Sequence, residues 1–70
     1  MENSLQKRVG KRIREIRDEK NISQQDLAAK CNFEKSNMSR LEAGKVNPTL
    51  STLEKISSAL EVNITELFNF

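Results

Sequence analysis

Four polar side chains near the middle of the chain have the types and spacing to bind a polar surface. Lys35, Ser36, Ser39 and Arg40 follow the spacing i, i+1, i+4 and i+5, which places them on one arc of an α-helix. Lys and Arg can donate to guanine O6 and N7, Ser is permissive, and a helix fits the DNA major groove. The spacing therefore predicts a helix that reads base edges of duplex DNA.

The helix that must carry this row is expected from about Lys35 to Ala43. Met38 and Leu41 fall on its opposite side and predict a core face, with Phe33 placed before the helix to pack on Met38. Gly44 can adopt the left-handed backbone conformation that commonly ends a helix.

A second short helix should precede it, starting at Ser23 as the N-cap, with Asp26 three residues later completing a capping box. Its small, mostly apolar face is Leu27, Ala28 and Cys31. Asn32 tolerates a left-handed backbone and can make a tight reversal into the next helix. Residues 23 to 44 therefore predict a helix-turn-helix.

Composition limits the number of domains, the cellular compartment and the kind of partner that this motif can have. Seventy residues allow one domain, 1–70, and the single cysteine excludes an intramolecular disulfide, so a reduced, cytoplasmic setting is expected. No apolar run is long enough to cross a membrane. The net charge is +2, and residues 1 to 45 hold eleven of the twelve Lys and Arg against seven acids. The basic residues thus share a half of the chain with the helix-turn-helix, as a domain with one DNA-facing side requires.

Three further helices are expected to support the pair. The first carries an apolar stripe and should stop near Asn21; the fourth is expected to be capped by Thr49 after Pro48, and the last to start with an Asn63–Glu66 capping box. The two stripes are Leu5, Val9, Ile13 and Ile16, then Leu50, Leu53, Ile56 and Leu60. The expectation is an all-α domain of five helices without strands, frayed over residues 1 to 4.

Taken together, these segments resemble the Xre and Cro/repressor family of small bacterial and phage helix-turn-helix regulators. The resemblance runs from Val9 to Leu67, through VGKRIREIR, ISQQDLAAKC and MSRLEAGKVNPTLSTLEKISSALEV. It implies the five-helix, lambda-repressor-like DNA-binding fold, and a homodimer that binds a palindromic double-stranded operator to control transcription, often as a repressor.

The resemblance also implies roles for single residues. Base contacts are implied for Gln24, Lys35, Ser36, Ser39 and Arg40, and contacts to the DNA backbone for Ser23, Asn37, Lys45 and Asn47. Arg17 and Glu42 match a family ion pair that ties the first helix to the recognition helix.

The chain departs from the family pattern at two positions. Asn32 replaces the usual turn glycine, and Glu34 stands where Ser or Thr often caps the recognition helix. A carboxylate suits the helix dipole but would repel a nearby phosphate, so Ser36 is an alternative cap.

Several residues have an alternative interpretation. Cys31 is expected to be a small core residue, because the chain has no second Cys or His to give it a redox or catalytic role. The basic face of the first helix is expected to be solvated, with contact of Arg12 or Arg14 to a flanking phosphate as the alternative. Ile64, Phe68 and Phe70, in the segment 62–70, are preferred as a dimer interface over a simple cover for the core.

These observations favour a sequence-specific DNA-binding regulator that acts as a homodimer on an inverted repeat. The residues for acid–base, metal or covalent catalysis are missing, so neither an enzyme, a metal site nor a cofactor is expected, and no segment is left over for a small-molecule effector. A restriction-modification controller and a phage-type repressor both remain open. The alternatives are an antitoxin-like protein that binds a toxin and its own promoter, and a protein-interaction module that has lost DNA binding.

Overall fold

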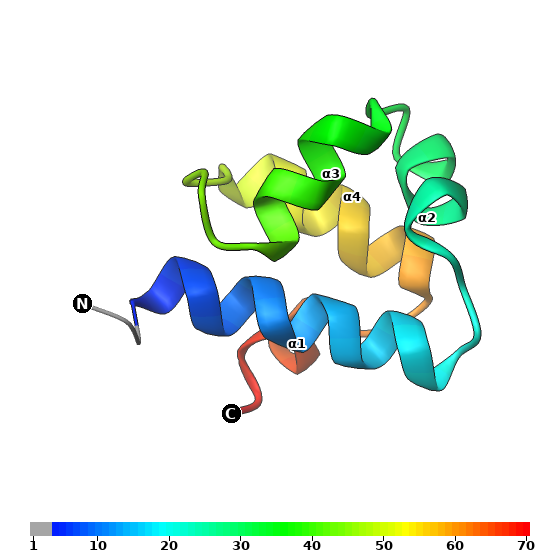
Figure 1. The fold of residues 1–70 in the computed structure, drawn as a ribbon. Coiled ribbons are helices and arrows are strands. Elements are labelled where there is room, and N and C mark those ends of the chain that lie inside the picture. Colours follow the sequence, from blue (N-terminus) through cyan, green and yellow to red (C-terminus); the bar gives the residue numbers. More distant parts are fainter. Residues whose placement is uncertain (1–3) are drawn as a thin grey trace.

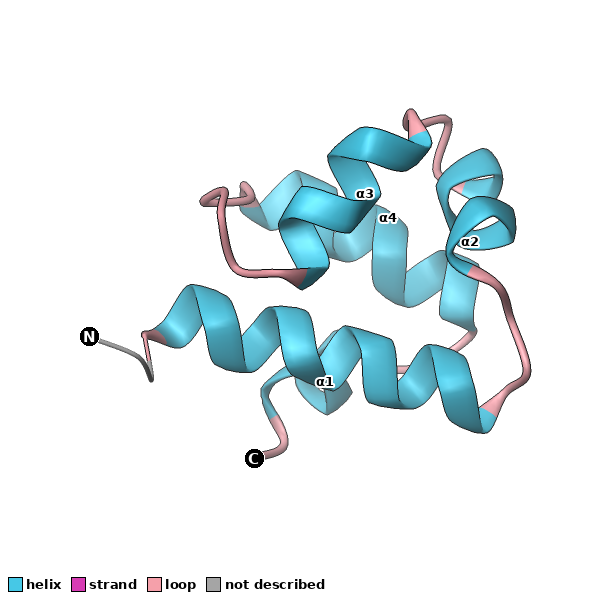
Figure 2. Cartoon of the chain, in the orientation of Figure 1, coloured by secondary structure: helices cyan, strands magenta, loops and turns pink. Residues whose placement is uncertain are grey.

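The computed structural model describes residues 4–70, which form four α-helices and one short 3-10 helix without any strand (Figures 1 and 2). The helices are α1 (Leu5–Glu19), α2 (Gln24–Lys30), α3 (Lys35–Glu42), α4 (Leu50–Leu60) and the 3-10 helix η1 (Ile64–Phe68). The all-α prediction is confirmed. Within the described range no helix is long and apolar enough to cross a membrane.

The prediction of a fifth α-helix is wrong, because the last element is a 3-10 helix of five residues. Of the predicted Asn63–Glu66 capping box, the Asn63 cap is confirmed and the Glu66 contact is wrong. Asn63 Oδ1 accepts from the backbone N–H and the hydroxyl of Thr65, each at 3.0 Å, and the Glu66 carboxylate accepts from Arg12 Nη2 at 3.2 Å instead. A long-range partner therefore takes the side chain that the local pattern assigned to the cap.

Hydroxyl caps begin three of the helices. Ser23 Oγ accepts from the backbone N–H of Asp26 at 3.0 Å, and Thr49 Oγ1 accepts from that of Thr52 at 3.1 Å, so both predicted caps are confirmed. Ser4 Oγ accepts from the N–H of Lys7 at 3.3 Å and caps α1, contrary to the predicted fraying at this residue. The rest of that prediction, residues 1–3, lies outside the described residues.

Two left-handed residues, Asn32 and Gly44, follow helices where the sequence predicts them. Asn32 has φ +59° between α2 and α3, and Gly44 has φ +75° after α3. α1 ends at Glu19, slightly earlier than expected, and Asn21 has φ +57° in the loop that follows. The left-handed turn at Asn32 makes the short connection between α2 and α3, the two helices of the helix-turn-helix.

The helices enclose one apolar core in which α3 packs against both α1 and α2, while α4 packs against α2 and η1 (Figure 1). At Gly10, α1 and α3 approach so closely that an added Cβ would lie 2.6 Å from the carbonyl oxygens of Leu41 and Glu42. Glycine at this position therefore lets α1 hold α3 by backbone contact, which fixes the orientation of its outer face.

Candidate nucleic-acid interface

The outer face of α3 carries the four side chains expected to contact bases. Lys35, Ser36, Ser39 and Arg40, called the recognition face below, are all exposed. Behind them Met38 is 0% exposed and Leu41 is 6% exposed. The buried side anchors the helix while the polar row stays available for a partner, which is the arrangement expected of a helix that enters a DNA groove.

α3 begins with Glu34 as its N-cap, and the alternative cap at Ser36 is wrong. Glu34 has an extended backbone (φ −73°, ψ 148°), and its side chain makes no capping hydrogen bond. Its exposed carboxylate lies at the positive end of the helix dipole, where negative charge is stabilising. The helix therefore starts at Lys35, and its first side chain belongs to the recognition face.

A polar cleft of about 400 Å³ adjoins the start of α3 and brings several expected DNA contacts together. Its lining residues come from α1, α2, the loop before α2, and α3: Arg14, Arg17, Ser23, Gln24, Gln25 and Lys35. Gln25 was not among the sequence-predicted contacts, and Arg14 was predicted only as an alternative contact to a flanking phosphate. Arg14 is 69% exposed in its side chain, and its contact with Asp18 is long, at 4.0 Å, so its charge faces solvent beside the cleft.

The remaining expected backbone contacts lie elsewhere on the surface. Asn37 and Asn47 line a separate hollow with Phe33 and residues 46–49, at the loop that follows α3. Lys45 is exposed in that loop, and its backbone N–H donates to the carbonyl of Arg40 at 2.9 Å. The candidate backbone contacts thus lie beside the start of α3, on α3 itself and in the loop that follows it.

Arg12 is not available for DNA. Its Nε donates to the carbonyl oxygen of Glu66 at 2.9 Å, its Nη2 donates to the Glu66 carboxylate, and its side chain is only 16% exposed. The alternative in which Arg12 approaches a phosphate is therefore wrong, because this arginine ties η1 to α1.

Arg17 and Glu42 form a buried ion pair between α1 and α3. Arg17 Nε donates to Glu42 Oε2 at 2.8 Å and Nη2 donates to Oε1 at 3.1 Å, with side chains 10% and 4% exposed. Arg17 Nη1 also donates to the carbonyl oxygen of Ile22 at 2.9 Å. The hydrogen bonds to Glu42 raise the pKa of Arg17 above its ordinary value, against the opposing effect of burial.

Gln24 joins this pair from the first position of α2. The side chain is partly buried, and its Nε2 donates to Glu42 Oε1 at 3.1 Å. Glu42 therefore receives hydrogen bonds from α1 and α2 while belonging to α3. Sequence patterns gave no indication of the contact with Gln24, since the two residues are 18 positions apart.

The residues expected to form a dimer interface differ in exposure. Phe68 and Phe70 are 39% and 54% exposed, whereas Ile64 is half-buried and packs against the core. The Arg8 guanidinium lies 5.0 Å from the centroid of the Phe70 ring. Ile64 thus contributes mainly to the fold, and the two phenylalanines contribute to the surface.

Leu5 and Leu50 begin the two predicted apolar stripes, but unlike the other stripe residues they are 56% and 75% exposed. Both line an apolar groove of about 200 Å³ together with Phe68. The groove, called the end groove below, is lined by Leu5, Gln6, Val9, Asn47, Pro48, Leu50, Leu53 and Phe68. Their positions at helix starts put these leucines at the margin of the core, where periodicity alone does not separate buried from exposed residues.

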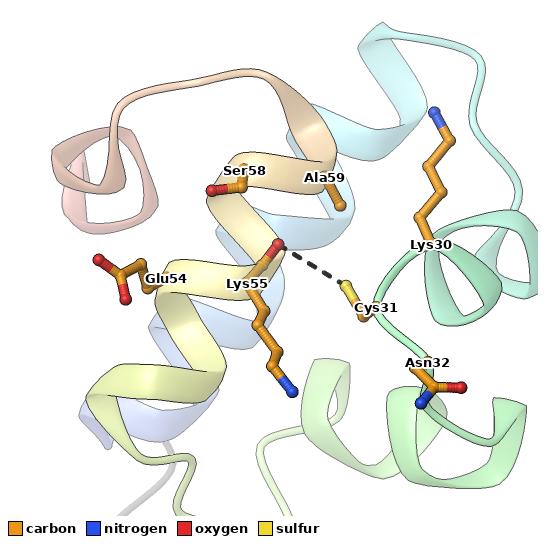
Figure 3. A pocket seen from close by; sticks show the side chains of 7 residues that line it. All are labelled: Lys30, Cys31, Asn32, Glu54, Lys55, Ser58 and Ala59. Atoms are coloured by element: carbon orange, nitrogen blue, oxygen red, sulfur yellow. Dashed lines mark hydrogen bonds between the residues drawn. The ribbon is translucent and has the colours of Figure 1, made fainter.

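Cys31 lies away from the recognition face, in an open cleft between α2 and α4 (Figure 3). The side chain is buried, and its Sγ lies 3.9 Å from the carbonyl oxygen of Lys55. Burial raises the pKa of the thiol, which disfavours the reactive thiolate. This environment matches the expected core role of Cys31.

Known DNA-binding proteins are similar to this chain in sequence. The family described as the Cro/C1-type HTH DNA-binding domain matches residues 12–70. The chain is 37% identical to the control protein C.MunI of Mycoplasma sp. over 96% of this chain and 92% of that protein. It is 38% identical to the control protein C.BamHI of Bacillus amyloliquefaciens over 100% and 88% of the two chains.

A phage protein is also similar, over a smaller part of its length. The immunity repressor of Bacillus phage phi105 is 39% identical over 84% of this chain, which spans only 41% of that repressor.

Among solved structures, the restriction-modification controller C.AhdI of Aeromonas hydrophila has a TM-score of 0.86 at 34% identity, covering 89% of this chain and 94% of that one. C.Esp1396I in a nucleoprotein complex has a TM-score of 0.84 at 37% identity, covering 96% and 87%.

Proposed function

The chain belongs to the Cro/C1-type HTH DNA-binding domain family, and we propose that it controls transcription as a homodimer bound to a short inverted-repeat operator. It is a DNA-binding regulator, and the family is one of regulators and not of enzymes. The observation that carries the proposal is the exposed recognition face of α3, fixed from behind by Met38 and Leu41.

Side-chain chemistry supports separate roles along this face. Lys35 and Arg40 only donate, which suits the O6 and N7 acceptors of guanine, and the hydroxyls of Ser36 and Ser39 can pair with several base edges. Gln24 adds a further base contact from α2. Contacts to phosphates are assigned to Ser23, Asn37, Lys45 and Asn47, which are all exposed.

A second copy of the chain is the proposed occupant of the end groove. Leu5, Leu50, Phe68 and Phe70 are the large apolar side chains most exposed within residues 4–70, and three of them line this groove. A homodimer buries the same patch on both copies, and it places two recognition helices about 34 Å apart for successive major grooves. The principal extents of one copy, 30 × 23 × 22 Å, are compatible with that separation.

The similarity to control proteins supports a role in a restriction-modification gene set over a phage-type repressor. C.MunI and C.BamHI are control proteins at 37% and 38% identity, and the solved restriction-modification controllers C.AhdI and C.Esp1396I match at 34% and 37% identity. Retention of a small protein partner during purification would instead favour the antitoxin-like alternative.

DNA binding is tested by selecting sites from a random duplex library at near-physiological salt. We expect an enriched inverted repeat with half-sites one helical turn apart. Lys35→Ala and Arg40→Ala should each relax the preference at one base position by about 1–3 kcal/mol without changing the melt, because both side chains are exposed. Lys30→Ala is the matched control, since Lys30 lines the cleft around Cys31 (Figure 3). Retention without sequence preference would contradict the proposal.

The dimer is tested separately by sedimentation equilibrium. Leu50→Glu should dissociate the dimer while the monomer stays folded, because Leu50 is 75% exposed and a charge there would be buried only between copies. Ser51→Glu places the same charge on the exposed neighbouring residue and should leave the dimer intact. An unchanged association constant for Leu50→Glu would exclude the end groove as the interface.

A further inference from the structure

We infer that Glu42 is a positioning residue for DNA recognition, because it holds the Gln24 amide in the one orientation that presents an acceptor and a donor to an adenine. The inference rests on the proposed function, since it names the base that Gln24 contacts. It assigns to the Arg17–Glu42 pair a role beyond stability of the fold.

The first step is the rigidity of the Glu42 carboxylate. Both of its oxygens accept from one guanidinium, Oε2 from Arg17 Nε at 2.8 Å and Oε1 from Nη2 at 3.1 Å. The guanidinium is itself held by the carbonyl oxygen of Ile22 at 2.9 Å. With its side chain only 4% exposed, Glu42 has little freedom to turn, so Oε1 is a fixed acceptor beside α2.

The second step is the orientation of the Gln24 amide. Gln24 Nε2 lies 3.1 Å from Glu42 Oε1, and an ionised carboxylate can only accept hydrogen bonds. The amide nitrogen, and not the amide oxygen, must therefore face Glu42. One N–H of Gln24 is used in this contact, and the second N–H and the oxygen Oε1 remain for another partner.

The third step is the position of that free edge. Gln24 is the first residue of α2 and lines the polar cleft with Lys35, the first residue of α3. The charged members of the recognition face, Lys35 and Arg40, can only donate. Gln24 adds an amide acceptor with a donor at its side, and this combination pairs with N6–H and N7 of adenine. An amide free to turn over would lose this selectivity.

The test compares four proteins: wild type, Gln24→Ala, Glu42→Gln and the double variant. Glu42→Gln keeps the size of the side chain but can turn an N–H toward Gln24, which allows the Gln24 amide to reverse. For each protein, anisotropy at fixed salt gives the affinity for the selected operator and for operators with each other base at the position that Gln24 faces. Every measurement is made at a temperature at which circular dichroism shows the protein fully folded.

In the wild type we expect adenine to be preferred roughly 5- to 150-fold at this position. Glu42→Gln should reduce this ratio about as far as Gln24→Ala does, and the double variant should reduce it no further. A merely structural role for Glu42 would weaken all operators alike and leave the ratio unchanged. The inference would be overturned if Glu42→Gln left this ratio unchanged. It would also be overturned if Glu42→Gln lowered the ratio in the Gln24→Ala background as much as it does in the wild type.

A measurement on the free wild-type protein keeps the inference testable if Glu42→Gln does not fold. The Gln24 side-chain amide protons should exchange with water more slowly than those of the exposed neighbour Gln25, because one of them is bonded to a buried carboxylate. Equal exchange at Gln24 and Gln25 would overturn the inference. If the wild type selects no sequence at all, the proposed function is overturned. If the wild type selects a sequence but Glu42→Gln does not change the preference for adenine, only the role of Glu42 is overturned.

Discussion

Replacement of Glu42 by alanine should strongly lower the free energy of unfolding. The change leaves the Arg17 guanidinium with a side chain only 10% exposed and without its bidentate partner. Breaking a buried ion pair in this way costs about 3–5 kcal/mol. The lower end is expected here, at ~3 kcal/mol, because Arg17 keeps its hydrogen bond to Ile22 and a 3.5 Å contact with Asp18 at the surface.

This loss is large for so small a domain. At roughly 0.05–0.15 kcal/mol per residue, 70 residues are expected to have about 4–10 kcal/mol of total stability. Since 1 kcal/mol shifts the midpoint of a domain of this size by about 4–8 °C, the melting temperature should fall by roughly 12–24 °C.

Thermal and urea unfolding, followed by circular dichroism, measure the effect. Glu54→Ala is the matched control, because Glu54 is an exposed glutamate in the middle of α4 and its loss should change stability by less than about 0.5 kcal/mol. The double variant Arg17→Ala/Glu42→Ala should cost less than the sum of the single changes, since neither charge is then stranded. A melting temperature for Glu42→Ala within a degree of wild type would refute the reasoning.

Three other perturbations have defined outcomes. Gly10→Ala should destabilise the fold by about 1–3 kcal/mol in urea, despite the better helix propensity of alanine, because the new Cβ meets the carbonyl oxygens of Leu41 and Glu42 at 2.6 Å; an unchanged or higher urea midpoint would contradict this. Cys31, buried and with a raised thiol pKa, should react with Ellman's reagent far more slowly in the native protein than in urea, and equal rates would show that the thiol is accessible. Lys45→Ala should lower the slope of log affinity against log salt by about 0.9 for operator and random duplex alike, whereas a loss confined to the operator would indicate a base contact.

Local chemistry explains which parts of the fold were predictable from the sequence. The Ser23 and Thr49 caps and the left-handed residues Asn32 and Gly44 act within a few positions along the chain, and the structure confirms them. At the last helix the same reasoning predicted the Asn63 cap correctly but failed for Glu66, because this carboxylate bonds to Arg12, 54 residues away, and not to its own helix start. A local pattern does not report a competing partner from a distant segment.

Some residues of the candidate site are predictable from local sequence patterns, and others are not. The polar arc of α3 follows from helical periodicity, and the structure leaves all four of its side chains exposed. Their DNA contacts remain a prediction, as do those of the flanking backbone residues. Gln25 became a candidate only when folding placed it in the polar cleft beside Gln24 and Lys35. Arg14, which the sequence offered only as an alternative phosphate contact, lines the same cleft.

By itself, the sequence determined the helical segments, the helix-turn-helix and the polar arc of α3, since each depends on spacing and capping over a few residues. Only the tertiary structure decided that Leu5 and Leu50 stay exposed in the end groove, and that Gln24 is bonded to Glu42. The physical reason is that burial and partner choice depend on how closely helices cross, which here is set by the backbone contact at Gly10 and by the Arg17–Glu42 pair.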